Sequence, residues 1–283
     1  MKFSVIADLH FPELDQTVDG LEEAKWSFYR SFLGDFLDHD ADMHISLGDL
    51  TNYGTTQELE GVYQIINSKD KNFYHVLGNH DLYAQSIENV LAITKQPLYH
   101  TVATDDVIFA FLNTAKEMDY DDWGGTINQE QLNWLEEVIE ASGTKPLFVF
   151  AHHPVYNTTA ISNLDKRSID PSIDMWRILN KKKGKGIYFN GHNHQNSIVH
   201  KGNWSFVQIA ACLDEQAWRS IELTENRIII TKYTISNPLL AGQASFIANN
   251  MDHFTPSSFV STKAEDNNAI LPILVEQDVI TNK

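Results

Sequence analysis

The sequence predicts an α/β fold, because short apolar runs typical of buried strands alternate with a pattern typical of an amphipathic helix. Residues 3–7, 43–47 and 73–77 are five-residue strand candidates, and apolar side chains between residues 17 and 38 recur near the 3.6-residue helical period. Strands separated by crossover helices pair in parallel with right-handed connections. The 283 residues can bury a large core, in one large domain or two small ones.

The second half of the chain predicts more strands and fewer helices. Asn128, with Gln131 three residues later, predicts a helix N-cap, and the residues before Lys181 predict a short helix. The last three strand candidates are separated by turns and suggest an antiparallel second sheet. The further strand candidates are residues 99–103, 107–113, 147–151, 187–190, 204–209, 218–223 and 227–235.

Two segments have an ambiguous pattern. Lys181–Lys183 and Gly184 favour a helix C-cap, in which lysines complement the dipole and glycine takes the C′ position, over a phosphate-binding patch. Periodicity fades beyond Asn237. We therefore assign residues 1–236 to one catalytic domain and residues 237–283 to a tail. The tail packs either on the domain or on a partner subunit, and in the second case the chain would form a homo-oligomer.

The composition excludes several classes of function. A formal net charge of −17 argues against binding a nucleic-acid polymer, because Lys and Arg contacts to phosphates supply most of that affinity. No run approaches the roughly 20 apolar residues of a membrane span, and the run 3–7 leaves no room for a signal peptide. The single cysteine, Cys212, cannot form an internal disulfide. We therefore expect a cytoplasmic protein without a membrane partner.

Five polar segments follow apolar runs and carry the chemistry. Ligands bind at the carboxyl ends of strands in open α/β sheets, so these segments can converge on one site. Their side chains are carboxylates, imidazoles and one amide, a set that suits Mn, Fe or Zn better than a structural, cysteine-rich zinc site. The segments are Asp8-Leu9-His10, Gly48-Asp49, Gly78-Asn79-His80-Asp81, His152-His153-Pro154 and Gly191-His192-Asn193-His194.

Local spacing supports this interpretation. Alternate residues of an extended segment point the same way, so Asp8 and His10 should lie on one side, as should His192 and His194. Glycines before Asp49, Asn79 and His192 should let the backbone turn sharply. Any one segment alone is more typical of a surface loop, and four further histidines are read as structural or exposed. These are His44, His75, His100 and His200.

The order of the five segments resembles that of the calcineurin-like metallophosphoesterase superfamily, over roughly residues 3–235. The resemblance implies a four-layer α/β/β/α sandwich of two mixed sheets flanked by helices. It also implies two metal ions, one held by Asp8, His10, Asp49 and His194 and the other by Asn79, His152 and His192, with Asp49 bridging. His152 is preferred over His153 because the family's ligand lies two residues before the proline, which leaves His153 beside the ligands or as a substrate contact.

The resemblance further implies a phosphohydrolase in which a metal-bridging hydroxide attacks the phosphorus atom. His80 would donate to the phosphoryl or leaving-group oxygen, and Asp81 would orient His80 or tune its pKa. We expect a phosphodiesterase for a small phosphodiester, with a cyclic nucleotide as one candidate. The alternatives are a phosphomonoesterase or nucleotide pyrophosphatase and, with less support, a metal-binding scaffold without catalysis.

Specificity is expected to come from three long loops near the metals, residues 11–17, 114–126 and 156–171. Four of their side chains could stack on a base or pair with a phosphate, although each also fits ordinary loop packing. They are Tyr120, Trp123, Tyr156 and Arg167.

Overall fold

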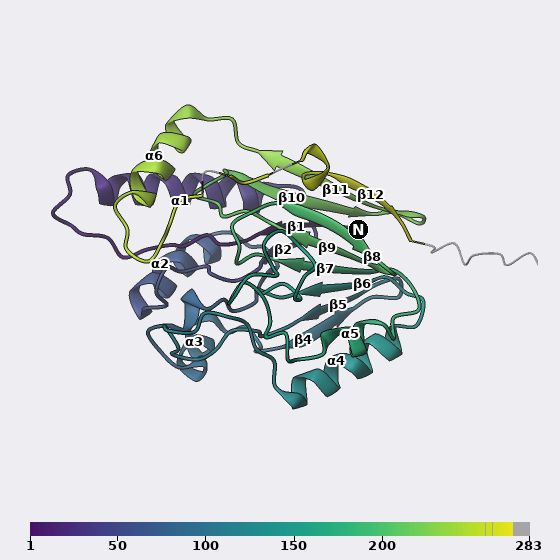
Figure 1. Ribbon diagram of the computed structural model, residues 1–283. Helices are drawn as coiled ribbons and strands as arrows, with labels where there is room; N and C mark the ends of the chain where they lie inside the picture. Colours follow the sequence, from purple (N-terminus) through teal and green to yellow (C-terminus); the bar gives the residue numbers. More distant parts are fainter. Residues whose placement is uncertain (258, 262, 274–283) are drawn as a thin grey trace, which may run out of the picture.

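Two mixed β-sheets stack face to face between two layers of helices (Figure 1). The structure is a computed structural model that describes residues 1–257, 259–261 and 263–273. Within these residues each sheet has six strands. The arrangement confirms the predicted α/β/β/α sandwich.

The first sheet has the order β12-β11-β10-β1-β2-β3. Strand β1 pairs in parallel with β2, and β2 with β3, as the predicted crossovers require, whereas β10 runs antiparallel to β1. The strands are β1 (Lys2–Ile6), β2 (Met43–Ser46), β3 (Phe73–His75), β10 (Ala217–Leu223), β11 (Arg227–Thr234) and β12 (Ala269–Pro272).

The second sheet has the order β4-β5-β6-β7-β9-β8. Its four inner strands are parallel, and both edge strands are antiparallel to their neighbours, including the predicted β4–β5 hairpin. The strands are β4 (His100–Ala103), β5 (Ile108–Phe111), β6 (Leu147–Phe150), β7 (Gly186–Asn190), β8 (Ser197–Lys201) and β9 (Trp204–Gln208).

Aromatic side chains fill the space between the sheets. The Phe3 ring on β1 meets the rings of Phe109, Phe148 and Phe150 edge to face, with centroids 5.0 to 5.8 Å apart. Such pairs add to the stabilisation from burial alone. This packing joins the two sheets into one core and fixes the strand ends relative to each other.

Helices cover the outer faces of both sheets. Helices α1 (Leu21–Asp38) and α6 (Pro238–Ala248) lie together over the first sheet, and α4 (Gln129–Ser142) and α5 (Met175–Leu179) cover the second (Figure 1). Helices α2 (Thr56–Asn67) and α3 (Ile87–Thr94) pack against each other. None of the helices in the described residues is both long and apolar enough to cross a membrane.

The three strands within residues 204–235 do not form the expected antiparallel second sheet together. Strands β10 and β11 pair antiparallel as expected but extend the first sheet beside β1, and β9 lies in the second sheet, parallel to β7. All five residues of β9 are buried, as is usual for an inner parallel strand covered on both faces. The edge strand β8, which pairs with β9, was not predicted.

The helix ends also differ from the predictions at two places. Helix α1 begins at Leu21, not at residue 17, because Gly20 precedes it with a left-handed φ of 74°. Helix α5 ends at Leu179, before the lysine run, and Lys182 Nζ donates to the carbonyls of Gly143 and Lys145 beyond α4. The lysine therefore satisfies carbonyl groups at the end of a neighbouring helix. The Asn128 cap is confirmed, since its side chain accepts the N–H of Gln131.

The described part of the tail packs on the same sandwich. Leu240, Ala244 and Ile247 of α6 join the buried cluster around α1, and β12 pairs with β11 at the edge of the first sheet. Residues 258, 262 and 274–283 of the assigned tail lie outside the described residues.

Candidate metal centre

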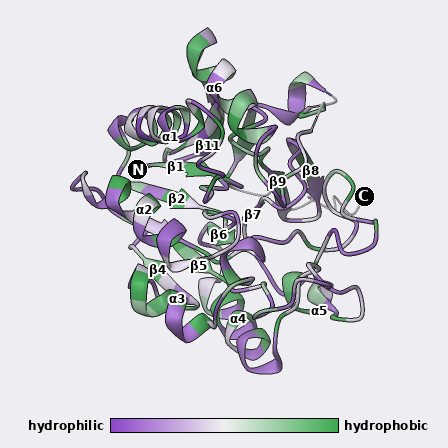
Figure 2. Cartoon of the chain, turned by 90° about the vertical axis from the view of Figure 1, so that its left-hand side faces the viewer, coloured by the Kyte–Doolittle hydropathy of each residue, from purple (hydrophilic) through white to green (hydrophobic). Residues whose placement is uncertain are grey.

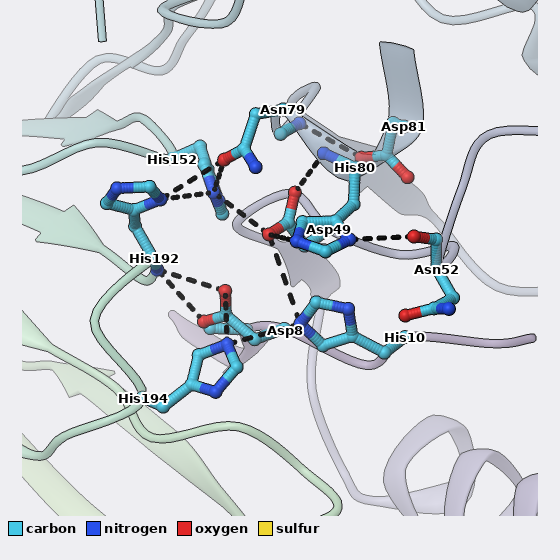
Figure 3. A network of polar contacts seen from close by, with 12 residues as sticks. Asp8, His10, Asp49, Asn52, Asn79, His80, Asp81, His152, His192 and His194 are labelled. Carbon is cyan, nitrogen blue, oxygen red and sulfur yellow. Dashed lines mark hydrogen bonds and ion pairs between the residues drawn. The ribbon is translucent and has the colours of Figure 1, made fainter. Parts of the chain in front are cut away.

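The predicted site residues lie in loops at one end of the two sheets. Figure 2 looks onto this end, where the loops after β1, β2, β6 and β7 meet between the helix layers. Both sheets contribute, because their parallel strands share a direction that brings the carboxyl ends together. The structure gathers Asp8, His10, Asp49, Asn79, His80, His152, His192 and His194 (Figure 3).

The backbone of these loops is strained at the site residues themselves. Asp8, His10, Asp49, His192 and His194 have φ between 49° and 70°, in the left-handed region that non-glycine residues rarely adopt. Strain of this kind collects at functional sites, where the surrounding structure holds it in place. The expectation of an extended Asp8–His10 segment is therefore wrong, although both side chains still reach the site.

Gly78 and Gly191 allow a neighbouring side chain to approach closely, and they do not form sharp turns. Of the three glycines that precede site residues, only Gly48 has a positive φ, 93°. A Cβ atom at Gly78 would collide with the Asp49 carboxylate, and one at Gly191 with the Asp8 carboxylate. These glycines therefore make room for the two carboxylates of the site.

Three acceptor atoms converge in one half of the centre. Asn79 Oδ1 lies 3.0 Å from His152 Nε2 and 3.1 Å from His192 Nδ1, and the two nitrogens are 3.2 Å apart. The other nitrogen of each imidazole lies 2.9 Å from a backbone carbonyl, that of Leu47 for His152 and that of Lys166 for His192. A carbonyl only accepts, so in the neutral form of each ring that nitrogen carries the proton and the facing nitrogen presents a lone pair. Burial acts to lower the pKa of His152, but Asp49 outweighs it and raises that pKa to about 9, so a cation bound here would take the place of a proton.

Asp8, His10 and His194 form the other half. The Nε2 atoms of His10 and His194 are 3.2 Å apart, and Asp8 Oδ1 lies 3.7 Å from His194 Nε2. Asp49 Oδ2 lies 3.2 Å from His152 Nε2 and 3.9 Å from His10 Nε2, so it stands between the halves. The centre could therefore hold metal ions on both sides of one shared carboxylate.

Burial perturbs the charges of the carboxylates. Burial raises the pKa of Asp8 to about 6, against the opposing effect of His194. Burial also acts to raise the pKa of Asp49, but the imidazoles of His152 and His80 outweigh it and hold that pKa well below its usual range. The donors are nitrogen and oxygen atoms without a thiolate, a set that suits Mn, Fe or Zn. The residues present therefore fit the metals that the sequence predicts.

His80 stands next to this centre. Its Nδ1 donates to the Asn52 carbonyl at 2.7 Å, and its Nε2 lies 4.0 Å from Asp49 Oδ2. Burial lowers the pKa of His80, while Asp49 opposes the shift. The ring is thus held from behind, with Nε2 directed to the side of Asp49 (Figure 3).

Asp81 has other partners in the structure than the predicted His80. Its buried carboxylate accepts from the N–H and hydroxyl of Thr51 and from the N–H of Gly78, and it pairs with His75. None of its described contacts reaches the His80 imidazole, which Asn52 orients instead. Asp81 fixes the loop that carries Asn79 and His80, and His75 is buried as a partner of Asp81.

Three of the five side chains predicted as substrate contacts line the cavity over the centre, which has a volume of about 720 Å³. They are Tyr120, Trp123 and Arg167. His153 does not line it, because it is buried and its ring nitrogens contact the Thr114 hydroxyl and the Trp123 carbonyl, both at 2.9 Å. Tyr156 lines neighbouring hollows instead, so its predicted contact is not supported.

Sequence reasoning missed three further contributors. Asp214 Oδ2 lies 3.6 Å from His194 Nδ1, and residues 253–257 line the cavity. Asn52 was missed as well, because it holds His80 through its backbone carbonyl. A lone acidic residue and a segment without periodicity carry no motif, so the sequence offered no signal for either.

Comparisons with known proteins find a family model that matches most of this chain. The family model described as Calcineurin-like phosphoesterase covers residues 1–196. A 3′,5′-cyclic-nucleotide phosphodiesterase of Nostoc is 22% identical over 156 residues, which span 55% of this chain and only 57% of that protein. A probable cyclic nucleotide phosphodiesterase of Fibrobacter succinogenes is 25% identical over 257 residues, 84% of this chain and 94% of that protein.

Two solved structures share the fold. The GAP50 anchor of the inner membrane complex of Plasmodium superimposes with a TM-score of 0.55 at 12% identity, covering 92% of this chain and 98% of its own. The purple acid phosphatase of yellow lupin seeds gives a TM-score of 0.54 at 11% identity, covering 94% of this chain and 54% of its own. At these identities the likeness extends to the fold alone.

Proposed function

We propose that this chain, which belongs to the calcineurin-like phosphoesterase family, is a metal-dependent phosphodiesterase that cleaves a small phosphodiester at a dinuclear centre. The observation that carries the proposal is the pair of donor groups that share Asp49, one with Asp8, His10 and His194 and the other with Asn79, His152 and His192. When bound, metal ions would supply an activated water and offset the negative charge of the phosphoryl oxygens.

His80 is the residue of this chain best placed to act on substrate. It lines the cavity beside Asp49, and its Nδ1–H is already committed to the Asn52 carbonyl. Donation to a phosphoryl or leaving-group oxygen therefore requires the imidazolium form, with its second proton on Nε2. Burial disfavours this form by lowering the pKa of His80, while Asp49 favours it. A donor held in this way stabilises charge that develops in the transition state without having to reorient.

The charge of the cavity favours a diester over a monoester. Arg167 is the one Lys or Arg among the described residues that line the cavity, and the chain has a formal net charge of −17. A diester carries one negative charge and a monoester up to two, so this protein repels a diester less. The exposed rings of Tyr120 and Trp123 on the cavity rim could stack on a flat group of the substrate. The names of the Nostoc and Fibrobacter relatives support a diester, with a cyclic nucleotide as one candidate.

The test is the hydrolysis of bis(p-nitrophenyl) phosphate beside p-nitrophenyl phosphate, with protein stripped of metal and titrated with manganese. We expect manganese-dependent cleavage that is faster for the diester. Faster cleavage of the monoester would favour a phosphomonoesterase. Manganese binding without cleavage of either ester would contradict an enzymatic role and favour a metal-binding scaffold.

A further inference from the structure

Residues 252–257, here called the wall segment, follow α6, and residues 253–257 line the cavity over the centre. They lie beyond the residues that the family model matches. The buried ring of Phe254 packs on two of the candidate ligands, with its centroid 4.9 Å from that of His10 and 5.3 Å from that of His194. The segment therefore touches the candidate ligands directly.

The wall segment also contacts the residue that holds His80. The side-chain amide of Asn52 donates to the Asp252 carbonyl at 2.8 Å, while the Asn52 carbonyl accepts from His80. On the same side, His253 Nδ1 forms a hydrogen bond of 2.8 Å with the Tyr120 hydroxyl. The His253 ring also stacks on the Tyr53 ring, with centroids 4.7 Å apart. These contacts fix the segment against loops from both sheets.

At its other end the wall segment holds Asp214. The N–H of Ser257 donates to Asp214 Oδ1 at 2.8 Å. The second oxygen, Oδ2, is buried, makes no hydrogen bond to the described residues and lies 3.6 Å from His194 Nδ1. It is thus directed at the nitrogen of His194 that faces away from His10.

We propose that Asp214, held by Ser257, and Phe254 are positioning residues for His194. A carboxylate at Nδ1 keeps the proton on that nitrogen and leaves the Nε2 lone pair facing His10, where a metal would bind. The Phe254 ring restricts rotation of the imidazole. Such carboxylate partners of ligating histidines contribute about 10- to 100-fold to metal affinity. The inference rests on the proposed function only in taking His194 as a ligand.

The test is calorimetric titration of metal-stripped protein with manganese, which reads metal affinity without reference to activity. We expect wild-type protein to bind in two steps. Asp214→Asn, which keeps the shape and removes the charge, should weaken one step about 10- to 100-fold and leave the other unchanged, and Asp214→Glu should restore part of the loss. Asp40→Asn, a change of the same type at an exposed carboxylate that follows α1 and pairs with Lys2, should bind as wild type.

Thermal unfolding of the metal-free variants separates positioning from folding. If Asp214→Asn unfolds early, Phe254→Leu, which keeps a buried apolar side chain, should still weaken the same step. Wild-type affinities in both steps for Asp214→Asn, or equal weakening of both steps, would overturn the inference. Failure of the proposed function would give a different result, because wild-type protein would then bind manganese and cleave neither ester. The differences in manganese affinity among the variants would still test the role of Asp214.

Discussion

Replacing Asp81 by alanine should destabilise the fold, not remove a catalytic group. The carboxylate is fully buried and receives four contacts: from Thr51 N at 2.9 Å, Thr51 Oγ1 at 2.8 Å, Gly78 N at 2.9 Å and His75 Nε2 at 3.1 Å. Alanine leaves two backbone N–H groups buried without an acceptor. The loop after β3 would then lose one of the groups that hold it to the loop after β2.

The size of the effect follows from these contacts. A buried donor left without a partner costs about 1–3 kcal/mol, and loss of one member of a buried charged network costs about 3–5 kcal/mol. Because the contacts share one carboxylate, their energies do not simply add. We therefore expect a loss of about 3–5 kcal/mol in unfolding free energy for Asp81→Ala. Asp81→Asn keeps one acceptor oxygen and should lose roughly half as much.

Urea unfolding of the metal-free protein measures this loss directly. The expected order of stability is wild type, then Asp81→Asn, then Asp81→Ala, while Asp105→Ala at an exposed hairpin turn should match wild type. The reasoning would be refuted by an Asp81→Ala protein that is as stable as wild type yet slow in catalysis. That result would return Asp81 to the role of tuning His80.

Three further predictions concern catalysis, specificity and pH. His80→Ala should lower turnover about 10²–10⁴-fold, while its metal content, measured by atomic emission, should equal that of the control variant His200→Ala. A loss of metal as large as the loss of turnover would make His80 a ligand. Trp123→Ala should raise KM for bis(p-nitrophenyl) phosphate more than Tyr156→Ala does, since only Trp123 lines the cavity, and equal effects would contradict that assignment. Burial lowers the pKa of His44 to about 4, so between pH 6.5 and 4 the unfolded chain binds more protons and stability falls as pH falls. Over that range the titration of His44 lowers the unfolding free energy by up to about 3 kcal/mol, and His44→Phe should remove this contribution. A variant with the same pH dependence as wild type would contradict the assignment.

The sequence predicted which side chains meet in the candidate site because the prediction needed only strand ends. Each polar segment follows an apolar run, and parallel strands bring their carboxyl ends to one edge. Asn52 could not be found in this way, since it holds His80 with a backbone carbonyl that every residue type possesses. The pairing of β9 with β7 was equally hidden, because the sequence of a strand does not reveal its partner strand.

The candidate centre depends on a backbone conformation that its motif does not show. In an extended Gly191–His194 segment, His192 and His194 would point the same way and serve one metal. Both residues instead adopt left-handed φ values, 70° and 54°. His192 Nδ1 thereby faces Asn79 and His152, while His194 Nε2 faces His10. Because one short loop supplies a histidine to each half, the two donor groups lie close enough to share Asp49.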